Sequence, residues 1–323
     1  MIRTNPMRMK GLKKLAILGL TIVSLGVVGC SSNGSNEETA TAETRVVQTV
    51  KGEVEIPADP QRIVDISGNS EELAVLGYTP VGTSNVDSYK TDSVPAYVQD
   101  ELGSAKVVGH AMMDTADIEA ILGLNPDLII MAPRQEKIYD QLKEIAPVVM
   151  VDDEYNDWEA KLMDVADIFE KQDEAQKWLD AYYAKAEEVS KEIKAAKGED
   201  ESYVVLSTDL ANGQFYAFTN AGLGTVLKDD LGLKQPVNMP GQDSIELPKV
   251  TIEGLAEIDA DNIVVIGSES DKAELANNSV WNEIRAVKDG NVTFLEQSPH
   301  FSQAYNPIGR LLELDTIKNT FVK

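Results

Sequence analysis

DEAQKWLDAYYAKAEEVSKEIKAAK, from Asp173 to Lys197, is the segment that most strongly determines the expected architecture. Neither glycine nor proline occurs from Val148 to Lys197, and Gly198 supplies a stop signal directly after it. Apolar side chains recur at helical spacing through the stretch, at Trp178, Leu179, Tyr182, Ala186, Val189 and Ile193. The pattern predicts one helix of about 37 Å, at about 1.5 Å per residue.

On both sides of this helix, short apolar runs alternate with helical patterns. Before it, strands are expected at 62–66, 80–83, 127–131 and 147–151, and helices at 69–76, 117–122 and 136–145. After it, strands are expected at 203–207, 214–218, 262–267 and 291–295, and helices at 224–231, 251–257, 271–285 and 305–322. Strands separated by helices are typical of parallel βα units. The sequence therefore predicts an α/β protein of two Rossmann-like lobes with central, mainly parallel sheets, joined by one long α-helix that acts as a stiff hinge.

The first 29 residues have the pattern of a secretory signal. A start with five basic residues and no acidic one precedes an apolar run over 15–28, and the chain's only cysteine, Cys30, follows in LGVVGC. The run is too short for a comfortable membrane span. Residues 31–44 are small and polar, and they predict a flexible tether. The alternative is an ordinary signal anchor with an incidental thiol, and Met1, Met7 and Met9 are all candidate start sites.

We expect five segments: a signal peptide at 1–29, a tether at 30–44, an N-terminal lobe at 45–157, a linking helical segment at 158–200 and a C-terminal lobe at 201–323. The signal holds five of the 29 basic residues and none of the 54 acidic ones, so the rest of the chain has a net charge near −30. This balance disfavours nucleic acid and anionic membrane surfaces as partners. A single cysteine excludes an internal disulfide and thiolate metal sites.

Several phrases follow one another in a fixed order: LGVVGC (25–30), IPADPQRIVDIS (56–67), DIEAILGLNPDLIIMA (117–132), YDQLKEIAPVVMV (139–151), LPKVTIEGLAEIDADNIVVI (247–266) and VWNEIRAVKDGNVTFLE (280–296). Together with the long helix, the chain resembles the solute-binding lipoproteins of Gram-positive ABC importers that capture iron siderophores, haem and cobalamin. The resemblance implies that Cys30 is diacylated and anchors a monomeric receptor on the outer face of the cell membrane. It also implies an ABC permease as partner, a cargo instead of an intrinsic cofactor, and a cleft between the lobes.

Cargo should contact the loops at the carboxyl ends of the parallel strands. Arg134 follows one strand, where its guanidinium can pair with a cargo oxygen, although a surface pair with Glu136 is the alternative. Ser67 and Asn69 belong to the first strand-to-helix turn, whose backbone amides can meet cargo oxygens. Aromatic and hydrogen-bonding surface is expected from Tyr216 on a strand and from His300, Phe301 and Tyr305 in the predicted loop 298–307, with ordinary packing as the alternative.

Receptors of the class that this chain resembles present one glutamate from each lobe to arginine pockets on the permease. The matching phrases place Glu119 and Glu253 at these positions, each in the first turn of a predicted helix. The alternative is that each glutamate only complements the helix dipole, which would contribute about 0.3–1 kcal/mol.

The distribution of arginines favours a neutral cargo. Five arginines follow the signal, and of these only Arg134 is placed at a predicted cleft loop, with Lys90 and Lys249 as further candidates to line the opening. A multiply charged anion would need several local cations, because an unpaired buried charge is unfavourable. We therefore expect a ferric siderophore of the hydroxamate type.

Two other functions stay open. One is a haem receptor with His300, His110 or Met112 on the iron, and the other is an extracytoplasmic sensor or adhesive module that binds no small molecule. An enzyme is not expected, because the sequence has no Gly-x-Ser-x-Gly motif, no cysteine beyond Cys30 and no phosphate-cradling loop. Two histidines are too few for a free zinc or manganese receptor, and no metal site is expected.

Overall fold

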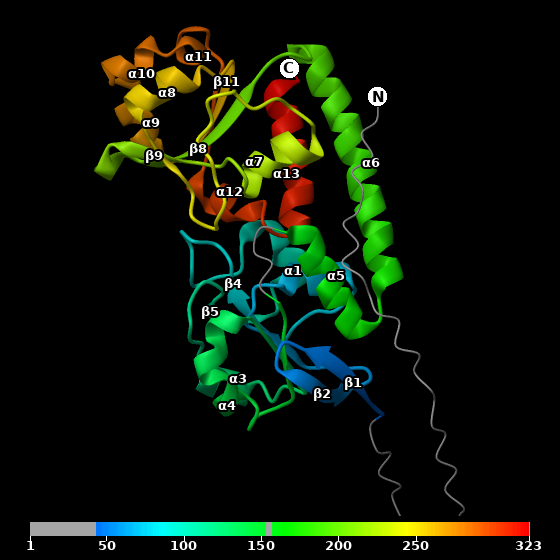
Figure 1. Cartoon of the computed structure of the whole chain (residues 1–323). Helices are drawn as coiled ribbons and strands as arrows, with labels where there is room; N and C mark the ends of the chain where they lie inside the picture. Colours follow the sequence, from blue (N-terminus) through cyan, green and yellow to red (C-terminus); the bar gives the residue numbers. More distant parts are fainter. Residues whose placement is uncertain (1–42, 153–156, 323) are drawn as a thin grey trace, which may run out of the picture. The chain divides into compact units, whose positions relative to one another are not determined.

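The computed structural model describes residues 43–152 and 157–322. The predicted signal peptide, Cys30 and nearly all of the predicted tether lie outside the described residues. In the part of the chain that is described, no helix is long and apolar enough to cross a membrane. The β-structure of this part consists of two five-stranded sheets and a hairpin (Figure 1).

The first five-stranded sheet is parallel throughout, with the strand order β5-β4-β3-β6-β7. Its strands are β3 Ile63–Asp65, β4 Gly82–Asn85, β5 Lys106–His110, β6 Leu128–Met131 and β7 Val148–Met150. The helices of this lobe are α1 Ser70–Val75, α2 Gln99–Leu102, α3 Ile118–Gly123 and α4 Tyr139–Leu142, with 3₁₀ turns η1 Ala96–Val98 and η2 Pro133–Ile138. The hairpin of β1 (Thr44–Thr49) and β2 (Gly52–Pro57) was not predicted, and it takes in Thr44 from the end of the predicted tether.

Both faces of this sheet are covered, as the side chains of β6 show. Leu128 and Ile130 belong to the buried cluster that includes α1 and α5 (Trp158–Phe169), whereas Ile129 and Met131 belong to the cluster that includes α3 and α4. Successive strand residues point to opposite faces, so a sheet covered on both sides needs an unbroken apolar run. This explains why β6 consists of consecutive apolar residues.

The second five-stranded sheet has the order β10-β9-β8-β11-β12. Its strands are β8 Tyr203–Asp209, β9 Gln214–Ala217, β10 Lys249–Thr251, β11 Asn262–Ile266 and β12 Val292–Leu295. β8, β11 and β12 are parallel, but β9 is antiparallel to both β8 and β10. The connection from β8 to β9 is the short turn η3 (Leu210–Asn212) and Gly213, which can join antiparallel strands but is too short for a parallel crossover.

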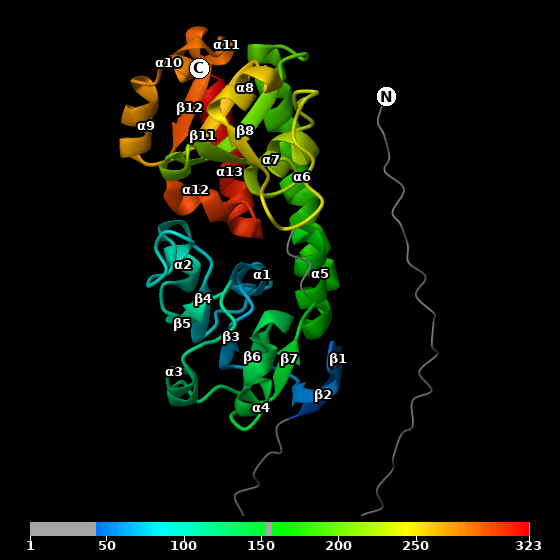
Figure 2. The ribbon, with the colours of Figure 1, turned by 60° about the vertical axis from the view of Figure 1, so that its left-hand side comes forward.

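Two helices link the sheets, and the longer one confirms the predicted long helix. This helix, α6, spans Gln172–Lys197, and its buried face includes Leu179, Tyr182 and Val189. It lies along one side of the molecule in both Figure 1 and Figure 2. The preceding helix α5 ends at Glu170, which adopts a left-handed conformation with φ 54°, and α5 packs back on α6 through Trp158, whose ring lies 5.0 Å from that of Tyr182.

The remaining helices cover the second sheet, and several differ from the prediction. They are α7 Gly222–Thr225 with the π-turn η4 Val226–Asp230, α8 Ile252–Ile258, α9 Glu269–Ala276, α10 Ser279–Glu283, α11 Arg285–Lys288, α12 Gln297–Gln303 and α13 Pro307–Phe321. The predicted single helix at 271–285 is wrong, because α9 ends at Ala276 and Asn278 caps α10 by accepting a hydrogen bond from the Trp281 amide at 3.0 Å. The predicted loop 298–307 is also wrong over most of its length, because α12 occupies it.

Candidate ligand-binding pocket

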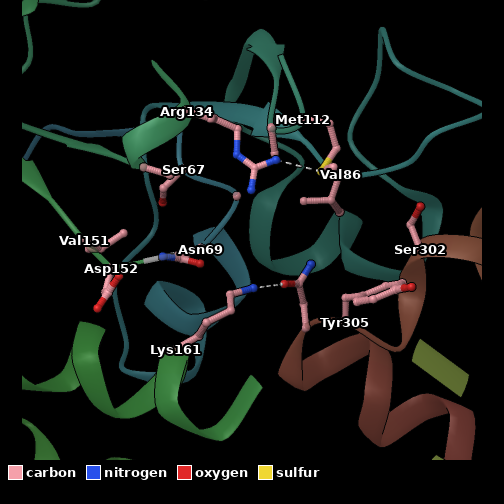
Figure 3. Close-up of a pocket in the computed structure, with 14 residues that line it drawn as sticks. Ser67, Asn69, Val86, Met112, Arg134, Val151, Asp152, Lys161, Ser302 and Tyr305 are labelled. Carbon is pink, nitrogen blue, oxygen red and sulfur yellow. Dashed lines mark hydrogen bonds between the residues drawn. The ribbon is translucent and has the colours of Figure 1, made fainter. Parts of the chain in front are cut away.

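A pocket lies where the carboxyl ends of the first sheet's strands meet the linker before α13 and the helix α5 (Figure 3). It encloses about 520 Å³ of empty space, including its mouth. Strand-end loops of parallel sheets are the usual place for ligands in α/β proteins. The described lining residues are Ser67, Gly68, Asn69, Val86, Ala111, Met112, Ala132, Arg134, Val151, Asp152, Lys161, Ser302, Tyr305 and Asn306.

The turn after β3 is shaped by a buried carboxylate. Asp65 is fully buried and accepts hydrogen bonds from the backbone amide of Ser67 at 3.0 Å and from the hydroxyl of Ser70 at 2.7 Å. Burial raises the pKa of Asp65, and the hydrogen bonds from Ser67 and Ser70 oppose this rise. Gly68 has φ +93°, and a Cβ there would lie 2.8 Å from the Cβ of Ala111, so only glycine lets the two loops approach.

Arg134 lies in the turn η2 after β6, on the opposite wall from Lys161 (Figure 3). Its Nη1 lies 3.0 Å from the sulfur of Met112. The neighbouring Gln135 is buried, and its amide nitrogen donates to the carbonyl oxygens of Ala111 at 3.1 Å and Met113 at 3.0 Å. Gln135 thereby fixes the loop of Met112 against the turn of Arg134. Sequence reasoning missed this role, because a glutamine beside a candidate arginine carries no distinctive signal.

Lys161 on α5 is a second cation in the pocket, and sequence reasoning missed it too. Its Nζ donates to the side-chain oxygen of Asn306 at 2.8 Å and lies 3.3 Å from Glu72 Oε1 on α1. The lysine therefore joins the linking helix to both lobes. Neither Lys90 nor Lys249, the lysines proposed from the sequence, occurs among the described lining residues. Lys161 lies in an amphipathic helix where lysine is expected on the solvated face, so only tertiary packing reveals its position.

The structure brings together four of the seven residues predicted to bind cargo, namely Ser67, Asn69, Arg134 and Tyr305. The other three, Tyr216, His300 and Phe301, are absent from the described lining of this pocket.

Each of the three lies against protein groups instead. The Nδ1 of His300 is 2.7 Å from Oε1 of buried Glu313, because α12 turns the imidazole toward α13. Phe301 packs edge-on against Phe218 on one side, at 5.5 Å between ring centroids, and Tyr89 on the other, at 5.4 Å. Tyr216 is half-buried on β9 beneath the ammonium of Lys249, which lies 5.8 Å from its ring centroid.

Direct contacts join the two lobes beside the pocket. Asp87 accepts a hydrogen bond from the hydroxyl of Ser298 at 2.6 Å, and Ser88 lies 3.3 Å from the hydroxyl of Ser302. Further in, a carboxylate oxygen of Glu71 accepts from the backbone amide of Gly309 at 2.8 Å. The pocket is therefore flanked by polar contacts between the two lobes.

The two glutamates predicted to dock on a permease are both exposed. Glu119 lies in the first turn of α3, which Asp117 caps by accepting from the Ala120 amide at 2.9 Å. Glu253 lies in the first turn of α8, which Thr251 caps through the Gly254 amide at 3.1 Å. Their matching positions fit docking and a dipole role equally well.

Among residues 43–152 and 157–322, no group of three or more His, Asp or Glu side chains is arranged to hold a metal ion. The three ligands considered for haem iron are also engaged with protein groups. His300 contacts Glu313, the Met112 sulfur contacts Arg134, and the His110 ring nitrogens lie 3.3 Å from the Asp87 carbonyl oxygen and 3.3 Å from the Met112 amide.

Comparison with known proteins agrees with a two-lobed binding fold. The chain belongs to the periplasmic binding protein family, whose model matches residues 67–299. The iron(3+)-hydroxamate-binding protein YxeB of Bacillus subtilis is 30% identical over 331 residues, covering 96% of this chain and 97% of the relative. The probable siderophore-binding lipoprotein YfiY of the same organism is 28% identical over 298 residues, covering 87% and 89%.

Two solved structures share the fold. Staphylococcus aureus SirA, complexed with staphyloferrin B, has a TM-score of 0.69 at 23% identity and covers 86% of this chain and 98% of its own. A FhuD fold-family periplasmic binding protein from Bacillus subtilis has a TM-score of 0.70 at 24% identity and covers 86% and 100%. The two curated relatives are named as binding proteins, and the protein described here is a binding protein of the same family, not an enzyme.

Proposed function

We propose that the protein is the extracytoplasmic substrate-binding lipoprotein of an ABC importer and that its cargo is a ferric siderophore of the hydroxamate type. The pocket supports this because it offers hydroxyl, amide and guanidinium groups that suit the oxygen-rich shell of such a complex. The protein would bind the organic shell and not the iron itself. No intrinsic cofactor is needed for this role.

The balance of charge around the pocket is the observation that carries the hydroxamate proposal. Its described lining contains two cations, Arg134 and Lys161, and one carboxylate, Asp152. Lys161 also lies 3.3 Å from the buried carboxylate of Glu72. A ferric tris-catecholate carries a charge near −3, and bringing it here would require unpaired positive charge that these groups do not supply. A nearly neutral ferric tris-hydroxamate fits without it. The relative named for iron(3+)-hydroxamate binding adds support.

Fluorescence titration of the purified protein tests the cargo. Ferric hydroxamates should quench the tryptophan emission with a lower dissociation constant than ferric citrate or ferric catecholates, and Arg134→Ala should weaken hydroxamate binding. Tighter binding of a catecholate, or a Soret shift with haem, would contradict the proposal. A protein whose fluorescence and thermal stability respond to none of these ligands would be a sensor or adhesive module instead.

The remaining parts of the proposal concern attachment and partners. Lipid on Cys30 would hold the receptor at the outer face of the cell membrane, with 30–44 as the tether. The lobes would be the proposed segments 45–157 and 201–323 around the linking segment 158–200. A monomer would dock on its permease through Glu119 and Glu253, which are both exposed and therefore accessible to a partner.

A further inference from the structure

Glu72 lies behind the pocket wall and is completely buried on α1. Its Oε1 is 3.3 Å from the ammonium of Lys161, whose side chain is 12% exposed and reaches the pocket. Neither carboxylate oxygen of Glu72 has a well-aligned hydrogen bond to a described residue. The lysine instead donates to Asn306 at 2.8 Å. The pair is therefore held mainly by charge.

The groups around this pair are acidic. Burial raises the pKa of Glu72, and the charge of Lys161 is the largest influence that opposes the rise. Asp65 and Glu71 are also buried, and burial raises the pKa of each carboxyl while the charge of Lys161 opposes the rise. On the protein side the ammonium lies 3.3 Å from the Glu72 carboxylate, which offsets its positive charge toward a ligand on the pocket side.

We propose that Glu72 is a specificity-determining residue that acts through Lys161. By offsetting the ammonium, Glu72 makes the pocket select uncharged ferric complexes over polyanionic ones. An anionic cargo would have to draw Lys161 away from Glu72, which would leave a buried carboxylate without its counter-charge. Glu72 is a positioning residue, since it does not line the pocket. This inference rests on the proposed function.

The test compares two probes of different charge, ferrichrome as the neutral complex and ferric enterobactin as the trianion. Glu72→Gln keeps the side-chain shape and removes the counter-charge. The ratio of the enterobactin to the ferrichrome dissociation constant should then fall about tenfold or more, because the released ammonium attracts the trianion. A general loss of folding would weaken both complexes and leave the ratio unchanged, so the ratio separates specificity from stability.

Two further variants sharpen the result. Glu313→Gln is the matched control, since Glu313 is equally buried but contacts His300 and not Lys161, and its ratio should equal that of the wild type. Adding Lys161→Gln to Glu72→Gln should remove the gain in enterobactin binding. If Glu72→Gln does not fold, Glu72→Met, which removes the charge and fills a similar volume, gives the answer, because it should lower the ratio in the same way.

The outcomes distinguish this inference from the proposed function. If the wild type binds ferrichrome but Glu72→Gln leaves the ratio unchanged, Glu72 does not set specificity, although the cargo class stands. An equal shift in Glu313→Gln would mean that net charge alone is responsible, and this too overturns the inference. If the wild type binds neither probe, the proposed function fails as well.

Discussion

Replacing Asp230 with alanine should destabilise the protein by about 3–5 kcal/mol, because the guanidinium of Arg310 would remain buried without its counter-charge. The Nε of Arg310 lies 2.7 Å from Asp230 Oδ2, and each side chain is only 3% exposed. Arg310 Nη1 also donates to Thr225 Oγ1 at 3.1 Å and to the Ala304 carbonyl oxygen at 3.0 Å, so the guanidinium is held in place when the carboxylate is removed. The hydroxyl of Tyr182, which donates to Asp230, would lose its acceptor at the same time.

Equilibrium urea denaturation of the purified protein, followed by circular dichroism, measures this loss in the free energy of unfolding. Asp315→Ala is the control, because the Lys185–Asp315 contact of 2.6 Å lies at the surface, with side chains 34% and 50% accessible. An exposed pair contributes at most about 1 kcal/mol. A loss of less than about 1 kcal/mol for Asp230→Ala would refute the reasoning. The double variant Arg310→Met/Asp230→Leu should be less destabilised than Asp230→Ala, since it leaves no buried charge.

Four further predictions follow from particular features. Burial raises the pKa of Glu71 to about 7 from 4.5, so protonation of this carboxyl favours the folded state. The stabilisation from protonation is fully present below about pH 4.5 and is lost as the pH rises through about 7. Glu71→Gln should therefore flatten the pH dependence of the urea midpoint between about pH 5 and about pH 8. Cys30→Ala should abolish lipid attachment, and unchanged membrane fractionation and detergent partitioning would count against the anchor. Glu119→Ala/Glu253→Ala should bind cargo normally but lose uptake, so full transport by this double variant would remove the docking role. Because the long helix resists bending, cargo should change the lobe angle little, and a large drop in the radius of gyration by solution scattering would contradict this.

The regular elements could be predicted where local sequence determines them. Helix α6 has an uninterrupted 3.6-residue period and no breaker, and α3 and α8 begin at the side-chain caps Asp117 and Thr251. The direction of β9 could not be predicted from its apolar run, because a short turn and not strand composition makes it antiparallel. The break before α10 was overlooked, although Asn277, Asn278 and Ser279 are residue types that favour helix ends.

The candidate pocket could be predicted in part, from the order of the strands and helices. Ser67 and Arg134 follow predicted parallel strands, and the ends of such strands converge by topology alone. Lys161 could not be found in this way, since the packing of α5 against α1 carries it to the pocket. His300 and Phe301 were misplaced because a segment with Pro299 reads as loop, whereas it forms α12 and turns His300 toward Glu313.

The buried cluster around the linking helices also limits which parts of the chain can be exchanged with those of a relative. Ile130 from the first sheet and Val264 from the second belong to one continuous interior, which Trp158 and Tyr182 of α5 and α6 complete. Each lobe therefore needs the shared helices α5 and α6 to bury the apolar side chains on its inner face. A chimera that takes one lobe from a relative would replace half of a jointly packed interior, and each lobe expressed alone would expose an apolar wall. The two lobes thus share one buried interior, although each has its own sheet.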